Sequence, residues 1–122
     1  MTHGKQVLAD LREPARNLRS RIPAVYDGYS ATHKAAFAAG ALDTKTKELI
    51  ALAIAVTTRC DGCIASHARG AARAGATAQE VAEALGVAIL MNGGPSTVYG
   101  PRALDAFLEF AEPAGPTGES AP

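Results

Sequence analysis

Apolar side chains recur at helical spacing near the start of the chain. Between residues 5 and 20 they are three or four positions apart, which is typical of one face of a helix. The residues concerned are Val7, Leu8, Leu11, Ala15 and Leu18. Pro14 lies inside this pattern and lacks a backbone donor, so we expect a kinked helix or two short helical pieces.

Five further helices are predicted, each delimited by residues that open or end helices. The openings are marked by Pro23, by Asp43 or Thr44, and by the capping box of Thr77 and Glu80. The ends are marked by Gly40, Gly75 and the run Gly93-Gly94-Pro95. We find no strand pattern. The predicted fold is all-α, a bundle of about six helices, at residues 5–20, 24–39, 45–58, 59–74, 77–92 and 96–112.

Two of these helices are apolar on almost every side. They contain Leu49–Val56 and Val81–Met91, the second interrupted by Glu83 and Gly86. A helix that is apolar all round must be buried all round, and a short chain has few layers with which to cover two of them. The pattern favours an oligomer, and the alternative is one central hairpin within a single chain.

Composition narrows the class of protein. The 122 residues suit one domain, and 27 alanines with no Trp predict a closely packed aliphatic core. Zero net charge argues against nucleic-acid binding. No apolar run is long enough for a membrane span and the start is polar, so we expect a cytoplasmic protein without membrane contact. The Pro/Gly/Ser-rich tail, residues 113–122, is expected to be disordered and dispensable.

The candidate chemistry lies in one segment. Cys60, Cys63 and His67 are spaced i, i+3, i+7, so a helix places them on one face. Two sulfurs three residues apart can form a disulfide, and a helix N-terminus lowers the pKa of a thiol. Because CxxC in a reducing compartment is typical of redox or metal chemistry, we predict a thiol redox site. The position of His67 favours Cys63 as the activated thiol, whereas the helix N-terminus favours Cys60.

Other interpretations of these residues remain open. A zinc site would need four ligands and only His67 is near the cysteines, and the thiols could also be inert and buried. Glu48 is an isolated acid at the start of an apolar helix, which is costly unless it is paired or functional. It could also be a first-turn acid that the helix dipole favours. His3 and His33 have no chemical neighbours in sequence and are interpreted as surface residues.

Glu48, Cys60, Cys63 and His67 together form the pattern E-x11-C-x2-C-x3-H. This pattern resembles the alkylhydroperoxidase AhpD-like branch of the carboxymuconolactone decarboxylase superfamily. The similarity covers about residues 22–112 and includes Ala41-Leu42-Asp43, Ala74–Thr77 and Gly93-Gly94-Pro95. It divides the chain into an N-terminal helical segment (1–21), the family-like domain (22–112) and the tail (113–122).

The resemblance implies an all-helical fold, assembly as a homohexamer or trimer, and a proton relay from Glu48 and His67 to the cysteine pair. It implies an antioxidant, peroxiredoxin-type enzyme that reduces a hydroperoxide or disulfide through a redox-active Cys60–Cys63 disulfide, with an external dithiol donor. No organic cofactor is expected, since neither GxGxxG nor a P-loop occurs. No metal is expected either, because a zinc site needs four ligands and only His67 is near the two cysteines. Gly62 replaces a histidine of some peroxidase members, which favours a weaker or different thiol oxidoreductase.

Two alternatives come from other classes. One is a redox-sensing or adaptor protein whose disulfide state changes its assembly. The other is a decarboxylase that works without the cysteines, although superfamily members of that kind generally lack the CxxC pair.

Overall fold

The structure is a computed structural model and describes residues 2–111. Every regular element in that range is a helix, which confirms the predicted all-α class. The six helices are α1 (Lys5–Arg21), α2 (Pro23–Phe37), α3 (Thr44–Thr57), α4 (Asp61–Arg73), α5 (Ala78–Asn92) and α6 (Gly94–Ala111). No helix in the described range is long and apolar enough to cross a bilayer. The tail predicted at 113–122 lies outside the described residues.

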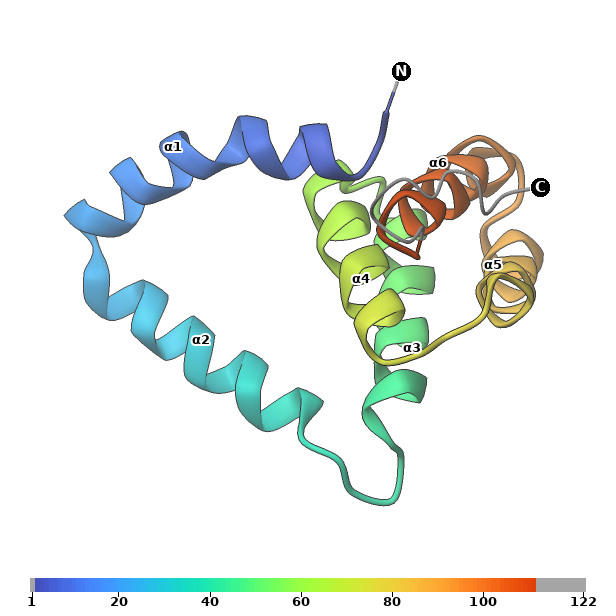
Figure 1. Cartoon of the computed structure of the whole chain (residues 1–122), viewed down its shortest axis with the longest axis horizontal. Coiled ribbons are helices and arrows are strands. Elements are labelled where there is room, and N and C mark those ends of the chain that lie inside the picture. Colours follow the sequence, from blue (N-terminus) through green and yellow to red (C-terminus); the bar gives the residue numbers. More distant parts are fainter. Residues whose placement is uncertain (1, 112–122) are drawn as a thin grey trace, which may run out of the picture.

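Helices α3 to α6 pack against one another and form the body of the molecule (Figure 1). Their shared core is built from a few large side chains and many alanines, which let the helix axes approach closely. The largest fully buried apolar side chains are those of Phe107, Leu52, Ile64, Val56 and Val81. The core is mostly aliphatic, as composition predicted, but the largest side chain in it is the aromatic ring of Phe107.

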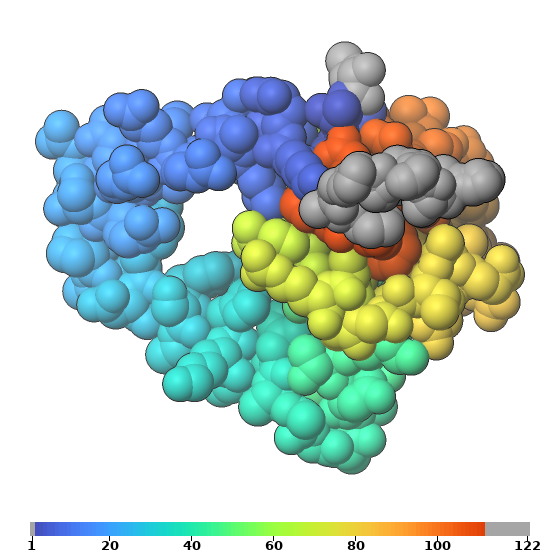
Figure 2. All heavy atoms as spheres, in the orientation of Figure 1, coloured from blue at the N-terminus to red at the C-terminus, as the bar shows by residue number. Residues whose placement is uncertain are grey.

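Helices α1 and α2 form an arm that has no buried residue in either helix. In Figure 1 α1 runs away from the body and α2 returns toward α3. The space-filling view shows an opening between the arm and the body (Figure 2). Leu18, Ile22, Val25, Tyr26 and Tyr29 line a groove of about 360 Å³ on the arm.

Both ends of the arm are tied to the body. At its start, Gly4 is buried and the Lys5 backbone N–H donates to Glu109 Oε1 of α6 at 2.7 Å. A Cβ at Gly4 would lie 2.8 Å from that same oxygen, so only glycine permits this close approach. At the other end, the Thr44 hydroxyl donates to the carbonyl of Phe37 at 3.1 Å.

Several helix boundaries differ from the prediction. α1 is one helix that continues through Pro14, not two pieces. α2 ends at Phe37 with Ala38 as its C-cap, so Gly40 is not the stop. Only Gly93 interrupts the chain before α6, because Gly94 and Pro95 already belong to its first turn, where the missing N–H of proline costs nothing.

Candidate functional site

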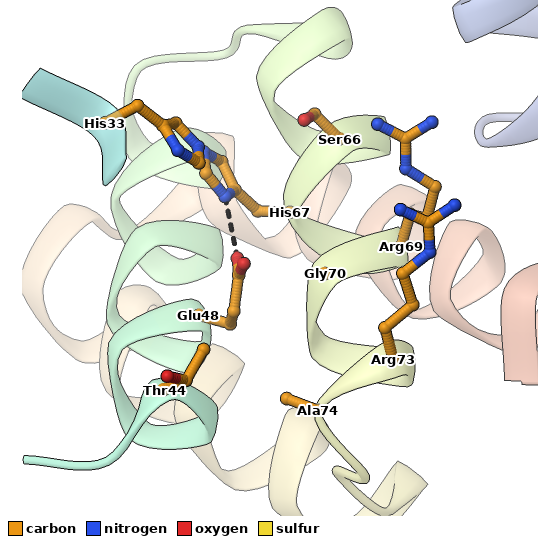
Figure 3. A pocket seen from close by; sticks show the side chains of 9 residues that line it. All are labelled: His33, Thr44, Glu48, Ser66, His67, Arg69, Gly70, Arg73 and Ala74. Atoms are coloured by element: carbon orange, nitrogen blue, oxygen red, sulfur yellow. Dashed lines mark hydrogen bonds and ion pairs between the residues drawn. The ribbon is translucent and has the colours of Figure 1, made fainter. Parts of the chain in front are cut away.

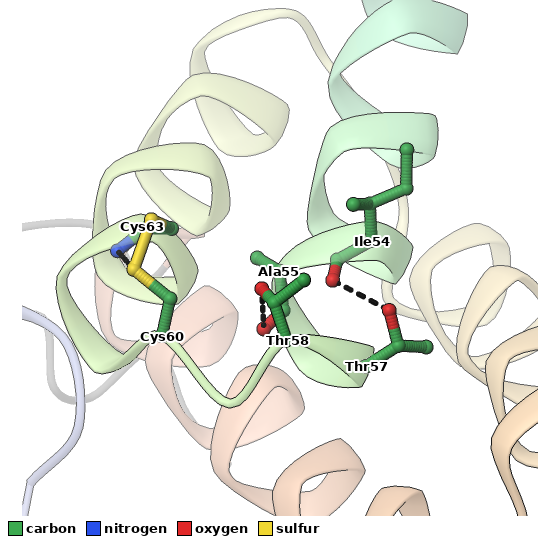
Figure 4. Close-up of a disulfide and its surroundings, with 6 residues drawn as sticks. All are labelled: Ile54, Ala55, Thr57, Thr58, Cys60 and Cys63. Carbon is green, nitrogen blue, oxygen red and sulfur yellow. Dashed lines mark hydrogen bonds between the residues drawn. A yellow bond between two sulfur atoms is a disulfide. The ribbon is translucent and has the colours of Figure 1, made fainter.

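Cys60 and Cys63 are joined by a disulfide at the start of α4 (Figure 4). Their Cα atoms are 5.2 Å apart. Cys60 is the N-cap of the helix, and its Sγ accepts the backbone N–H of Cys63 at 3.2 Å. The sulfur thus occupies the place that a serine or aspartate oxygen usually takes at a helix start.

The turn before the disulfide explains why α4 does not begin at Arg59, where the sequence had suggested. Arg59 has a φ of 55°, and no other non-glycine residue in the described part of the chain has a positive φ. The Cys60 N–H reaches back to the carbonyl of Ala55 at 3.2 Å, which closes the end of α3. A left-handed residue is costly, so this tight reversal places strained backbone beside the sulfurs.

Glu48 of α3 and His67 of α4 form a hydrogen-bonded pair between the two helices. His67 Nδ1 lies 2.8 Å from Glu48 Oε1, and the two side chains are only 18% and 11% exposed, respectively. With Nδ1–H donating to the carboxylate, Nε2 is left to accept or release a proton. The buried acid that the sequence flagged as costly is therefore paired.

Gly70 makes room for this carboxylate. A Cβ built at Gly70 would collide with both carboxylate oxygens of Glu48. Gly70 and His67 are three residues apart on the same face of α4, so one helix supplies both the partner of Glu48 and the gap that receives it. Sequence reasoning assigned no role to this glycine.

The arm adds an aromatic stack on His67. The ring of Phe37 is 5.4 Å from that of His67, and the ring of His33 is 4.7 Å from that of Phe37. His33 and His67 are 6.1 Å apart with nearly parallel planes. His33 is exposed, as interpreted from the sequence, but it does have a chemical neighbour.

His67 separates two hollows on the surface. On one side is the sulfur groove, about 240 Å³, which His67 and Cys63 line together with Ala51, Ile54, Ala55 and Thr58. On the other side is the polar cleft, about 340 Å³ (Figure 3). Its lining residues are His33, Thr44, Glu48, Ser66, His67, Arg69, Gly70, Arg73 and Ala74. The imidazole of His67 can thus act on a molecule bound in either hollow.

Arg69 and Arg73 were not singled out in the sequence, although a signal was available. Cys63, His67, Gly70 and Arg73 follow spacings of four and three residues, which places all of them along one face of α4. Extending the cysteine–histidine pattern by two turns would have reached Arg73. Within residues 2–111, no three His, Cys, Asp or Glu side chains come together in a way that could hold a metal ion.

Gly62, between the two cysteines, faces the arm. A Cβ at this position would lie 3.0 Å from Leu11 Cδ1 of α1. A larger side chain, such as the histidine of some peroxidase members, would therefore need Leu11 to move.

The comparisons with known proteins agree with this architecture. The profile of the carboxymuconolactone decarboxylase family matches residues 23–111. This chain belongs to that family. A family member from Legionella pneumophila, solved in its apo form, has 42% sequence identity and a TM-score of 0.84, over 88% of this chain and 96% of that one. A protein from Thermotoga maritima has 30% identity and a TM-score of 0.76, over 86% and 92% of the two chains.

Relatives with curated sequences are described as uncharacterized. One from Haemophilus influenzae is 43% identical over 106 residues, which is 87% of this chain and 94% of the relative. Another, from the cox locus of Paracoccus denitrificans, is 43% identical over 84 residues, 69% of this chain and 76% of the relative. The family is thus established, and the chemistry has to be argued from the site.

Proposed function

We propose that this family member is a thiol oxidoreductase that reduces peroxide or disulfide substrates. The proposal is carried by one observation: His67 lines the sulfur groove beside Cys63 and is hydrogen-bonded on its other side to the buried Glu48. A carboxylate fixes the orientation of the imidazole, and an oriented imidazole beside a thiol is the usual arrangement for activating a sulfur nucleophile.

The cycle begins with the dithiol. A thiolate attacks a peroxide oxygen, the O–O bond breaks, and the leaving alkoxide takes a proton from the imidazolium of His67. The sulfenic acid that forms is attacked by the second thiol, which gives the Cys60–Cys63 disulfide and releases water. With a disulfide substrate, the first thiolate forms a mixed disulfide and the second displaces it. An external dithiol then reduces the protein, which suits a reducing compartment such as the cytoplasm.

The two sulfurs have different surroundings that suggest their order of reaction. Cys63 is exposed and shares its groove with His67, whereas Cys60 is half-buried at the helix start. We propose that Cys63 attacks the substrate and that Cys60 resolves the intermediate. The Cys60→Ser variant should then still react once with substrate and retain a mixed disulfide or sulfenic acid, and Cys63→Ser should not react at all. Mass spectrometry after one equivalent of substrate distinguishes the two orders.

The relay is tested with Glu48→Gln and His67→Gln, which keep hydrogen-bonding groups in place. Each should slow turnover with hydroperoxide and a dithiol donor by about 10²- to 10⁴-fold, the usual contribution of a general acid or base. Glu83→Gln, which changes an exposed acid on α5, is the matched control. If both site variants turn over and are alkylated at the wild-type rates across pH 5 to 9, the Glu48–His67 pair is purely structural. Activity that survives replacement of both cysteines would favour the decarboxylase alternative instead.

We also propose that the protein works as a homo-oligomer, a hexamer by resemblance to short members of the AhpD-like branch. Large apolar side chains remain exposed on one chain, including Ile54 of α3 (56%), Leu90 and Met91 of α5 (80% and 76%) and Val25 of the arm (64%). Many large apolar side chains left exposed on one chain are typical of a protein that buries them at subunit interfaces. Light scattering that gives a multiple of 12.5 kDa, rather than that mass itself, is the expected result.

A further inference from the structure

We propose that the polar cleft binds a carboxylate group of the substrate, held by Arg69 and Arg73. This inference rests on the proposed function, because it concerns the substrate of the same site. Both arginines line the cleft together with the Glu48–His67 pair. Figure 3 shows the two guanidinium groups close together, on the side of α4 away from the Glu48–His67 pair.

The charge of the cleft is unbalanced in favour of an anion. Among residues 2–111, Glu48 is the one acid in its lining, and its carboxylate is already bonded to His67. Neither Arg69 nor Arg73 takes part in an ion pair with any residue from 2 to 111. Two like charges one helical turn apart repel each other, so a bound anion between them relieves an unfavourable arrangement.

The dipole of α4 accounts for the placement of only one of these arginines. Arg73 lies in the last turn of α4, where the helix dipole favours a cation. That effect falls off within a turn and does not account for Arg69, which is half-buried one turn earlier. A guanidinium that loses part of its hydration without a partner is costly, and a carboxylate supplies the bidentate partner that it prefers.

The surroundings of the two arginines favour a carboxylate over a phosphate. Phosphates usually bind where backbone N–H groups point outward, at a helix N-terminus. The N-terminus of α3 does reach the cleft at Thr44, but the Asp43 carboxylate already caps it by accepting the Thr46 N–H. A singly charged carboxylate needs only the two guanidinium groups.

The distance to the sulfur sets the size of the substrate. Arg69 and Arg73 are six and ten residues beyond Cys63, which corresponds to about 9 and 15 Å along the helix at about 1.5 Å per residue. Helical side chains lean toward the helix N-terminus, and Figure 3 shows both arginine side chains extending that way, so their guanidinium groups lie closer to Cys63 than these spacings. A substrate whose reactive sulfur or oxygen lies over Cys63 would therefore carry its carboxylate about one to two helical turns away. His67 lies between the two points and can reach the reacting end.

Two small disulfides test this assignment on the full-length reduced protein. The first is 5,5′-dithiobis(2-nitrobenzoate), which carries two carboxylates, and the second is the neutral 4,4′-dithiodipyridine. One cysteine thiolate attacks a probe sulfur and expels an aromatic thiolate, and the other cysteine displaces the second one. The probe takes up two electrons, its S–S bond breaks, the Cys60–Cys63 bond forms, and the cysteine protons pass to solvent. Stopped-flow absorbance follows both releases.

The test compares Arg69→Gln/Arg73→Gln with Arg12→Gln/Arg16→Gln. The control pair has the same spacing and charge change on the exposed surface of α1. We expect the cleft variant to react about 10- to 100-fold more slowly with the carboxylate probe, the range of a lost charge-assisted hydrogen bond. Its rate with the neutral probe should stay within about twofold of wild type. The control should match wild type with both probes.

Equal slowing with both probes, or none with the carboxylate probe, would overturn the inference while leaving the proposed function standing. If the wild type re-forms its disulfide with neither probe, the proposed function fails and the inference fails with it. Competition identifies the anion. At constant ionic strength, benzoate should slow the carboxylate probe in the wild type and have no effect in the cleft variant. Inhibition by inorganic phosphate but not by benzoate would overturn the carboxylate assignment.

Discussion

The arm and the body of this molecule are built from helices of similar length, but they acquire their stability in different ways. α1 is strongly amphipathic, yet it has no buried residue. α3 and α5 are apolar on nearly every side and supply core residues such as Leu52, Val81 and Leu85. A regular apolar stripe thus predicts that a helix forms, but only the topology determines what covers it.

The arm and the body also contribute different residues to the site. The body supplies the disulfide, the Glu48–His67 pair and the two arginines, all from α3 and α4. The arm supplies only aromatic cover through His33 and Phe37. Chemistry that needs fixed geometry therefore comes from the closely packed body, whereas the contribution of the arm depends on its ties at Gly4 and Thr44.

The largest expected effect comes from the core of the body. Phe107 is 1% exposed, and Phe107→Ala should lower the free energy of unfolding by about 3–5 kcal/mol because it leaves a cavity. This loss should not depend on protein concentration. Leu18→Ala in the arm should cost less, and its cost should vary with concentration if subunits cover that side chain. Urea titrations at two concentrations measure both, and a concentration-independent loss at Leu18 would show that the arm is stabilised within one chain.

A smaller effect is expected from a methyl group beside the site. Gly70→Ala should displace the Glu48 carboxylate, cost about 1–3 kcal/mol from overpacking and slow turnover by about 10²-fold. Gly28→Ala in α2 is the matched arm variant, since its Cβ would have no neighbour within 4 Å. It should be neutral or stabilising by about 0.5–1 kcal/mol. Equal effects of the two alanines on turnover would contradict the role given to Gly70.

A charge placed on the arm should leave the chain folded and change only its assembly. Val25→Glu adds a carboxylate to the apolar groove of α2, where the side chain is 64% exposed. We expect the unfolding free energy of the separated chain to change by less than about 0.5 kcal/mol, as for other surface substitutions. Light scattering should show a smaller mass. Ala31→Glu, an exposed position on the same helix away from the groove, should keep the wild-type mass.

The smallest effect concerns an ion pair within the body. The Thr77 N–H and Lys45, which lies 2.9 Å from Glu80, lower the pKa of Glu80 below its ordinary value. The stability that this carboxylate contributes is present above its unfolded pKa, about 4.3, and is lost as pH falls through the lowered folded pKa. Glu80→Gln should therefore lower Tm by a few degrees at most at pH 7 and by less at pH 3. A Tm difference between wild type and Glu80→Gln that is larger at pH 3 than at pH 7 would contradict this assignment.

Much of the body could be predicted from the chain alone. Helical spacing places Cys60, Cys63 and His67 on one face, and the capping box at Thr77 opens α5 as expected. These features are local, so short-range patterns contain them. The approach of Glu48 to Gly70 joins two helices, and nothing in the spacing of either helix specifies it.

The arm was predicted less completely for the same reason. Its two helices were expected, but their attachment to the body depends on the contact of Lys5 with Glu109, which is more than a hundred residues away in the chain. His33 was interpreted as isolated because its neighbour His67 belongs to another helix. Contacts of this kind come from topology and not from local periodicity.

The groove on the arm also determines how the protein can be observed in solution. The chain has no Trp and three tyrosines, so its ultraviolet emission comes from tyrosine alone. Two of the three, Tyr26 and Tyr29, lie in the arm groove, and Tyr29 is 68% exposed. Docking of anything on the arm would take these rings out of water. Tyrosine fluorescence therefore reports on the arm without an added label.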